Sequence, residues 1–93
     1  MEFEWDPRKA ATNLARHGVS FREAATAFAD PLGWSFPDPG HSLGEGRYIL
    51  IGVSARGRIL MVAHTDRDDR TRIISAREAT RSERRFYEEG SQG

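Results

Sequence analysis

The chain has 93 residues and no cysteine, and its 14 basic side chains balance its 14 acidic ones. This length suits a single domain, residues 1–93, with one modest core, and the lack of cysteine excludes disulfides and thiolate metal sites. No apolar run approaches the roughly 18 residues of a membrane span. The acidic, aromatic start MEFEWDP does not resemble a signal peptide. We therefore expect a cytoplasmic protein that does not enter a membrane.

The charges are unevenly distributed along the chain. Residues 1–46 carry four basic and seven acidic side chains, whereas residues 47–93 carry ten basic side chains, all arginine, and seven acidic ones. Arginine forks match phosphate oxygens better than lysine does, so the C-terminal half is a weak indication of nucleic-acid binding. A general preference for arginine codons explains the same composition equally well.

The N-terminal third predicts a short strand at residues 2–5 and then two helices. Asp6 and Pro7 are typical of an N-cap and a first helical position, and Gly18 of a helix end. On this first helix we expect four apolar residues to face the sheet, namely Ala10, Ala11, Leu14 and Ala15. Its polar stripe comprises Lys9, Asn13 and His17. Such a stripe is either a solvated face or the border of a binding groove.

Ser20 and Glu23 fit a capping box that starts the second helix. We expect this helix to bury Phe21, Ala24, Ala25 and Phe28 and to end at Asp30-Pro31. Residues 31–46 then hold three of the four prolines and four of the nine glycines. Trp34–Phe36 is a candidate edge strand, because Pro37 is incompatible with a central one, and His41 in the following loop is expected to be a surface residue.

The centre of the chain predicts an antiparallel meander. Residues 48–53 and 59–64 are short apolar runs rich in β-branched side chains, joined by a hairpin turn at Arg56-Gly57. A longer loop at 66–70 leads to a third strand that begins at Arg72 and runs through Arg77. These two arginines are five residues apart, so in a regular strand they face opposite sides of the sheet.

Thr80 and Glu83 fit another capping box, which predicts a last helix that starts near Arg81. This helix has only Phe86 and Tyr87 to bury, so it lies on a groove or meets a partner. The expected fold class is therefore α+β, with two N-terminal helices packed on an antiparallel sheet and a short C-terminal helix beside it.

The sequence holds no phosphate-binding glycine loop, no paired histidines with zinc spacing and no nucleophile elbow. We expect neither a cofactor nor a metal site, although hydrolysis by two carboxylates remains open. The arginines, His64, Glu83 and Tyr87 at strand ends and on the last helix suit cleavage of RNA without a metal. In that reaction the ribose 2′-OH is the nucleophile, so the protein orients the backbone, neutralises the phosphate and moves protons.

The chain resembles the BrnT family, small RelE-like ribonuclease toxins of bacterial type II toxin–antitoxin pairs. The resemblance covers residues 3–88. It is carried by Phe3-Glu4-Trp5-Asp6, Lys9, Asn13, His17-Gly18, Val19-Ser20-Phe21 with Glu23-Ala24, Asp30-Pro31, Arg47, Ile51-Gly52, Gly57-Arg58, Arg72-Ile73-Ile74-Ser75-Ala76-Arg77, Ala79-Thr80, Glu83 and Tyr87. It implies an endoribonuclease that inhibits translation and is neutralised by a cognate antitoxin with a ribbon-helix-helix DNA-binding domain. Operator DNA is then bound only through the antitoxin.

From these observations we predict three groups of functional residues. The catalytic candidates are Arg77, Glu83, Tyr87 and His64; for His64 a structural place at the core margin is the alternative. The candidates for RNA binding are Lys9, Asn13, His17, Arg67, Arg70 and Arg81. The candidates for antitoxin binding are Arg72, Arg77, Arg81 and Arg84.

Two other functions fit the same sequence. A non-catalytic RNA-binding or adaptor module would bind RNA in a salt-sensitive way without cleaving it. A structural half of a transcriptional autorepressor would bind an operator only together with its partner and would not be toxic alone.

Overall fold

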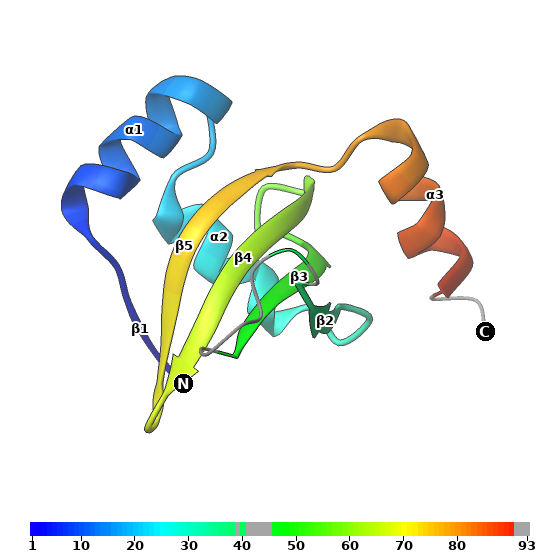
Figure 1. The fold of residues 1–93 in the computed structure, drawn as a ribbon. Coiled ribbons are helices and arrows are strands. Elements are labelled where there is room, and N and C mark those ends of the chain that lie inside the picture. The colour runs from blue at the N-terminus through cyan, green and yellow to red at the C-terminus, as the bar shows by residue number, and fades with distance from the viewer. Residues whose placement is uncertain (39, 41–45, 91–93) are drawn as a thin grey trace.

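The structure, a computed structural model, describes residues 1–38, 40 and 46–90; His41 lies outside them. The elements in chain order are β1 (Glu2–Glu4), α1 (Pro7–His17), α2 (Phe21–Thr26), the 3₁₀ helix η1 (Ala27–Ala29), β2 (Trp34–Pro37), β3 (Arg47–Val53), β4 (Ile59–Arg67), β5 (Arg70–Glu78) and α3 (Arg81–Gly90). The five strands form one sheet in the order β1-β5-β4-β3-β2 (Figure 1).

The α+β class and the antiparallel meander of β3, β4 and β5 are confirmed, with β2 as an antiparallel edge strand. The sheet is nevertheless mixed, because β1 pairs with β5 in parallel at the other edge. A three-residue strand that precedes the helices can join only an edge left open by the meander, and local sequence patterns do not reveal its direction.

One face of the sheet packs on helices. α2 and η1 lie across this face in Figure 1, and the core between them and the strands consists of Val19, Phe21, Ala24, Ala27, Leu50, Leu60, Val62, Ile73 and Ala76. The approach is close at Gly52, where a Cβ atom would stand 2.8 Å from the carbonyl oxygen of Ala27. No real Cβ is tolerated at that distance, so glycine lets η1 contact β3 directly.

The ends of α1 are those expected from its sequence. The Asp6 carboxylate accepts a hydrogen bond from the Arg8 backbone N–H at 2.8 Å, Pro7 is the first residue of the helix, and Gly18 ends it with a left-handed φ of 69°. In the described part of the chain no helix is long and apolar enough to cross a membrane.

The buried side of α1 differs from the predicted one. Leu14 is 52% exposed, whereas Asn13, expected in the polar stripe, is only 6% exposed. The Asn13 side-chain amide donates to the carbonyl oxygens of Val19 at 2.9 Å and of Ala76 at 2.8 Å, and its oxygen accepts from the Ala76 N–H at 3.0 Å. α1 thus turns a polar side chain toward β5, because backbone groups at this contact need hydrogen-bond partners.

A β-bulge changes which residues of β5 share a face. Ala63 of β4 pairs with Ser75, but His64 pairs with Ile73, so Ile74 is an additional residue on β5. Arg72 and Arg77 consequently pair with Thr65 and Met61, two β4 residues on one face. The expectation that Arg72 and Arg77 face opposite sides of the sheet is therefore wrong.

Both hydrogen bonds of the predicted capping box at the start of α3 are formed. The Thr80 N–H donates to the Glu83 carboxylate at 2.9 Å, and the Glu83 N–H donates to the Thr80 hydroxyl at 3.3 Å. Tyr87 holds the helix against the rest of the fold: its ring stacks on Trp34 with centroids 6.0 Å apart, and its hydroxyl donates to Asp30 at 2.5 Å. α3 therefore stands at the β2 side of the sheet (Figure 1).

Candidate functional site

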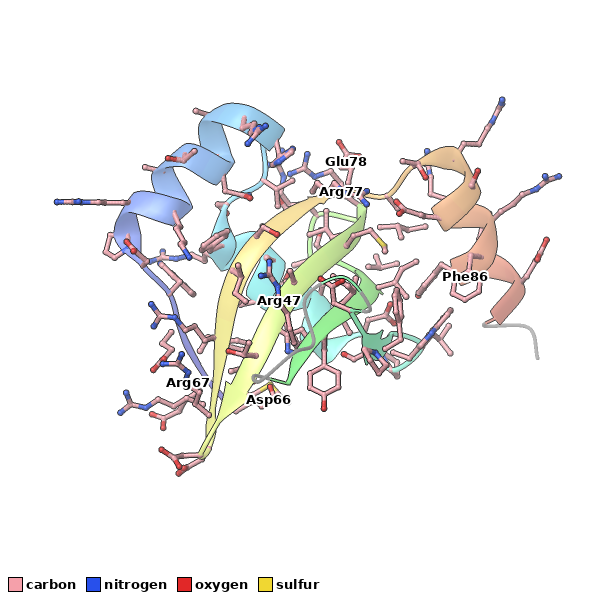
Figure 2. The ribbon with its side chains drawn as sticks, in the orientation of Figure 1. Arg47, Asp66, Arg67, Arg77, Glu78 and Phe86 are labelled. Carbon is pink, nitrogen blue, oxygen red and sulfur yellow. The ribbon has the colours of Figure 1, made fainter. Side chains whose placement is uncertain are left out.

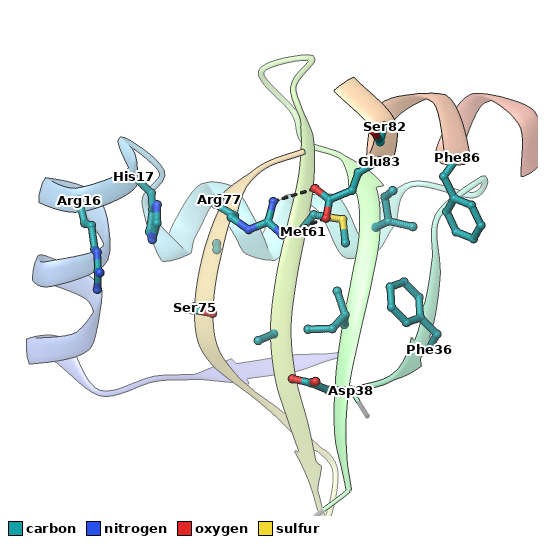
Figure 3. Close-up of a pocket in the computed structure, with 14 residues that line it drawn as sticks. Arg16, His17, Phe36, Asp38, Met61, Ser75, Arg77, Ser82, Glu83 and Phe86 are labelled. Carbon is teal, nitrogen blue, oxygen red and sulfur yellow. Dashed lines mark hydrogen bonds and ion pairs between the residues drawn. The ribbon is translucent and has the colours of Figure 1, made fainter. Parts of the chain in front are cut away.

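The sheet face opposite α2 carries a groove of about 630 Å³ between the end of α1 and the start of α3 (Figure 3). Its floor is apolar and includes Ile49, Ile51, Met61 and Ala63 from the neighbouring strands β3 and β4. The other lining residues are Arg16, His17, Phe36, Asp38, Ser75, Ala76, Arg77, Ser82, Glu83 and Phe86. The groove thus combines an apolar floor with charged groups along its border.

Arg77 and Glu83 form a two-pronged ion pair at the upper end of this groove (Figure 3). The Nη1 and Nη2 atoms of Arg77 donate to the two Glu83 carboxylate oxygens at 2.7 and 2.9 Å. Nη1 also lies 3.2 Å from the Glu78 carbonyl oxygen. This geometry fixes the guanidinium plane, while the Arg77 side chain stays 43% exposed. Arg77 and Glu83 do meet, as predicted.

The same pair determines the charge of both groups. Hydrogen bonds from Arg77 and from the Thr80 N–H lower the pKa of Glu83 to about 2, against the opposing effect of its burial. Its carboxylate raises the pKa of Arg77 in turn. Glu83 is therefore ionised at neutral pH and is a weak base with no proton to give. Its role here is to hold a permanently charged guanidinium in the groove.

The last turn of α1 supplies the opposite border. Arg16 and His17 are exposed and line the groove, and Figure 3 shows both on the far side of Arg77 from Phe36 and Phe86. A second hollow of about 290 Å³ continues between α1 and β5, with Lys9 and His17 in its lining. Two members of the predicted stripe, Lys9 and His17, thus border open grooves.

Asn13, the third member of the stripe, has a different role. Although it belongs to the wall of the second hollow, it is buried and its amide is bonded to the backbone of Val19 and Ala76. The prediction that Asn13 faces RNA beside Lys9 and His17 is therefore wrong, because its donors and acceptor are already used to join α1 to β5.

His64 lies on the opposite face of the sheet from Arg77. It is 3% exposed, packs edge-on against Phe28 with centroids 4.9 Å apart, and its Nε2 lies 3.2 Å from the Ser35 hydroxyl. Burial lowers the pKa of His64, and the nearby Asp66 carboxylate opposes this only in part. The structure gives His64 the place at the core margin, so it does not join Arg77 and Glu83.

Tyr87 also falls outside the groove. Its side chain is 7% exposed, and desolvation together with the hydrogen bond to Asp30 raises the pKa of Tyr87 to about 12. Its hydroxyl therefore keeps its proton and holds α3 in place. The expected convergence of Tyr87 with Arg77 is wrong because the two residues are tied to different partners.

The remaining predicted arginines are not gathered in one place. Arg70 and Arg72 pair with Glu4 of β1 at 3.5 and 3.1 Å, and Arg67 lies by the β4–β5 turn, far from Arg77 in Figure 2. Arg81 and Arg84 line a separate hollow on α3. Of the four predicted antitoxin-binding arginines, only Arg77 lines the groove.

Several residues of the groove were not among the predicted functional residues. Phe36, Phe86, Ser75, Ser82, Asp38 and Arg16 line it. The sequence predicted that Phe86 is buried, but it is 56% exposed. Arg16 could have been found as the neighbour of His17. Ser75 precedes Arg77 by two residues on β5, so the alternation of a regular strand already places both on this face. Among the described residues no group of three or more His, Asp or Glu side chains is placed to hold a metal ion.

The structure resembles the 1.1 Å-resolution crystal structure of the Brucella abortus ribonuclease toxin BrnT, with a TM-score of 0.68 and 25% sequence identity over 87% of this chain and 99% of that one. The fold is therefore that of a small ribonuclease toxin. Residues 5–83 match the family described as "Ribonuclease toxin, BrnT, of type II toxin-antitoxin system", and the chain belongs to this family. No curated protein sequence gives a significant match.

Proposed function

We propose that this chain is an endoribonuclease that cleaves RNA without a metal ion, with Arg77 as the group that stabilises the reacting phosphate. The observation that carries the proposal is the Arg77 side chain, which is 43% exposed and whose guanidinium is fixed by Glu83 at the upper end of an open groove. Among the described residues no hydrogen bond is donated by its Nε atom, so one side of the fork is still available to a phosphate oxygen.

The reaction needs few protein groups. The ribose 2′-OH attacks the adjacent phosphorus and loses its proton, while the P–O5′ bond breaks and the leaving oxygen gains a proton. The products are a 2′,3′-cyclic phosphate and a 5′-hydroxyl. Arg77 stabilises the charge that develops on the phosphate oxygens. Glu83 acts as a positioning residue, because its ion pair holds the guanidinium.

His17 is the proposed proton carrier. Imidazole exchanges protons near neutral pH, and among the described residues His17 is the histidine that lines the groove. It replaces His64 and Tyr87 in this role, since both are committed to the structure away from the groove. Lys9 and Arg16 extend the positive border along α1 and support contacts with neighbouring phosphates.

Inhibition of translation and neutralisation by a cognate antitoxin complete the proposal. An antitoxin with a ribbon-helix-helix domain would block RNA by covering Arg77 and the arginines Arg81 and Arg84 on α3, and operator DNA would be bound only through that domain. Arg72 is a weaker candidate for this contact than the sequence suggested, because Glu4 already pairs with it at 3.1 Å.

The test is cleavage of a defined RNA oligonucleotide by purified protein in excess EDTA. We expect Arg77→Ala to lower kcat by about 10²–10³, the usual effect of removing one group that stabilises transition-state charge. Arg84→Ala, a matched change outside the groove, should leave cleavage unchanged. Full activity of a folded Arg77→Ala protein contradicts the proposal. Activity that EDTA abolishes and divalent ions restore contradicts metal independence, and RNA binding without cleavage establishes the non-catalytic alternative.

A further inference from the structure

Phe86 packs against a neighbouring aromatic ring and is nevertheless exposed to solvent. Its ring contacts Trp34 with centroids 5.4 Å apart, and Trp34 is itself stacked on Tyr87, whose hydroxyl is bonded to Asp30. Despite this support Phe86 is 56% exposed. A rigid aromatic ring with an uncovered surface loses little conformational entropy when a flat partner stacks on it. Phe86 is thus prepared for such a contact.

Phe86 also lies close to the ion pair between Arg77 and Glu83. Phe86 follows Glu83 by three residues on α3, so the two lie on the same face of the helix about one turn apart, or roughly 5 Å. Glu83 holds Arg77, and Phe36 of β2 lines the groove below Phe86 (Figure 3). An anion-binding fork and an aromatic surface therefore stand beside each other in the same groove.

We propose that the groove is a nucleotide subsite for single-stranded RNA, in which the base next to the cleaved phosphate stacks on Phe86 above the apolar floor. This inference rests on the proposed function and names the form of its substrate. A phosphate alone needs no apolar floor, whereas a nucleotide carries both a negative phosphate and a base with an apolar face. Duplex RNA keeps its bases stacked and paired, so it cannot fill this subsite.

The experiment separates binding from cleavage. RNA oligonucleotides whose 2′-oxygens are methylated cannot supply the nucleophile, so fluorescence anisotropy with them measures affinity alone. Stacking of one base contributes roughly 1–3 kcal/mol by alanine substitution, so Phe86→Ala should weaken single-stranded RNA binding roughly 5- to 150-fold. Phe86→Trp should restore binding to within about threefold. Leu32→Ala, which removes a side chain that is also about half exposed (54%) but does not line the groove, is the matched control and should change nothing.

An abasic nucleotide makes the test specific. In a series of methylated oligonucleotides, a single abasic nucleotide is placed at each position around the cleavage site in turn. The affinity of each oligonucleotide is measured for the parent protein and for Phe86→Ala. At one position the missing base should weaken binding to the parent protein, and Phe86→Ala should then cause no further loss. The same RNA annealed to its complement should bind the parent protein more weakly than the single strand and should not respond to Phe86→Ala.

Three results overturn the inference: a folded Phe86→Ala protein that binds single-stranded RNA like the parent, an equal loss on intact and abasic RNA at every position, or a loss of antitoxin binding alone with RNA binding unchanged. Failure of the proposed function looks different. In that case the parent protein binds methylated RNA through Phe86 but cleaves no unmodified RNA.

Discussion

Replacement of Asn13 by alanine tests how α1 is joined to the strand that carries Arg77. In the folded protein the Asn13 amide satisfies the Val19 carbonyl and both the carbonyl and the N–H of Ala76, at 2.8–3.0 Å. Alanine leaves these three backbone groups without partners at a site where the parent side chain is only 6% exposed. Each such loss costs about 1–3 kcal/mol, and water that enters the new space recovers a part.

We therefore expect Asn13→Ala to lower the free energy of unfolding by about 3–5 kcal/mol, a large share of the roughly 5–15 kcal/mol of a typical domain. Urea titration followed by circular dichroism measures this, and the melting temperature should fall by at least about 12 °C. Asn13→Asp should be no better, because a carboxylate cannot donate to the two carbonyls. Thr12→Ala, at the exposed neighbouring position, should stay within about 0.5 kcal/mol. A loss below about 1 kcal/mol in Asn13→Ala refutes this account of the contact.

Three further predictions concern the other residues placed by the structure. Because burial holds the pKa of His64 below its ordinary value of 6.5, the folded state resists protonation, so the unfolding free energy should fall as pH drops below about 6.5. His64→Gln should remove that slope in pH-dependent urea titrations without changing the pH profile of cleavage; a flattened cleavage profile contradicts its structural role. Tyr87→Phe should destabilise the fold by roughly 1–3 kcal/mol through the lost bond to Asp30 yet keep cleavage, and a normal melting temperature would show that this bond is dispensable. Lys9→Ala should lower the salt slope of RNA binding by about one, and a slope equal to the parent's assigns Lys9 to solvent.

Local signals predicted most of the secondary structure correctly. Asp6, Pro7 and Gly18 set both ends of α1, and Thr80 with Glu83 set the start of α3. These signals work because capping bonds and φ restrictions act within a few residues of the chain. The parallel pairing of β1 with β5 joins residues about 68 positions apart, and nothing in a three-residue strand specifies such a partner.

The site was harder to predict, because its membership depends on long-range geometry. The burial of Asn13 depends on the backbone of Ala76, 63 residues away, and this contact turned Leu14 outward against the apolar pattern of the helix. The common face of Arg72 and Arg77 depends on the bulge at Ile74. By contrast, Arg77 and Glu83 are only six residues apart. Their pairing could be predicted because the sequence placed Arg77 at the end of a strand and Glu83 in the first turn of the helix that follows.

Comparison of the glutamates in the first turns of α2 and α3, Glu23 and Glu83, explains why one arginine is a candidate for chemistry and another is not. Glu23 in α2 accepts from both Nε and Nη2 of Arg58, whose Nη2 also donates to the Gly18 carbonyl and whose Nη1 lies 3.4 Å from Glu78. All three nitrogens of Arg58 are thus engaged, with Glu23 only 7% exposed.

Glu83 holds Arg77 through its two terminal nitrogens alone, and the Arg77 side chain stays 43% exposed beside an apolar groove. Both glutamates accept hydrogen bonds from an arginine guanidinium, but the two arginines differ in how many of their nitrogens remain available to a ligand. A guanidinium bonded through all three of its nitrogens stabilises the fold and keeps at most one N–H for a ligand. The partly bonded one keeps its charge, its orientation and a free side, which together are what a reacting phosphate requires.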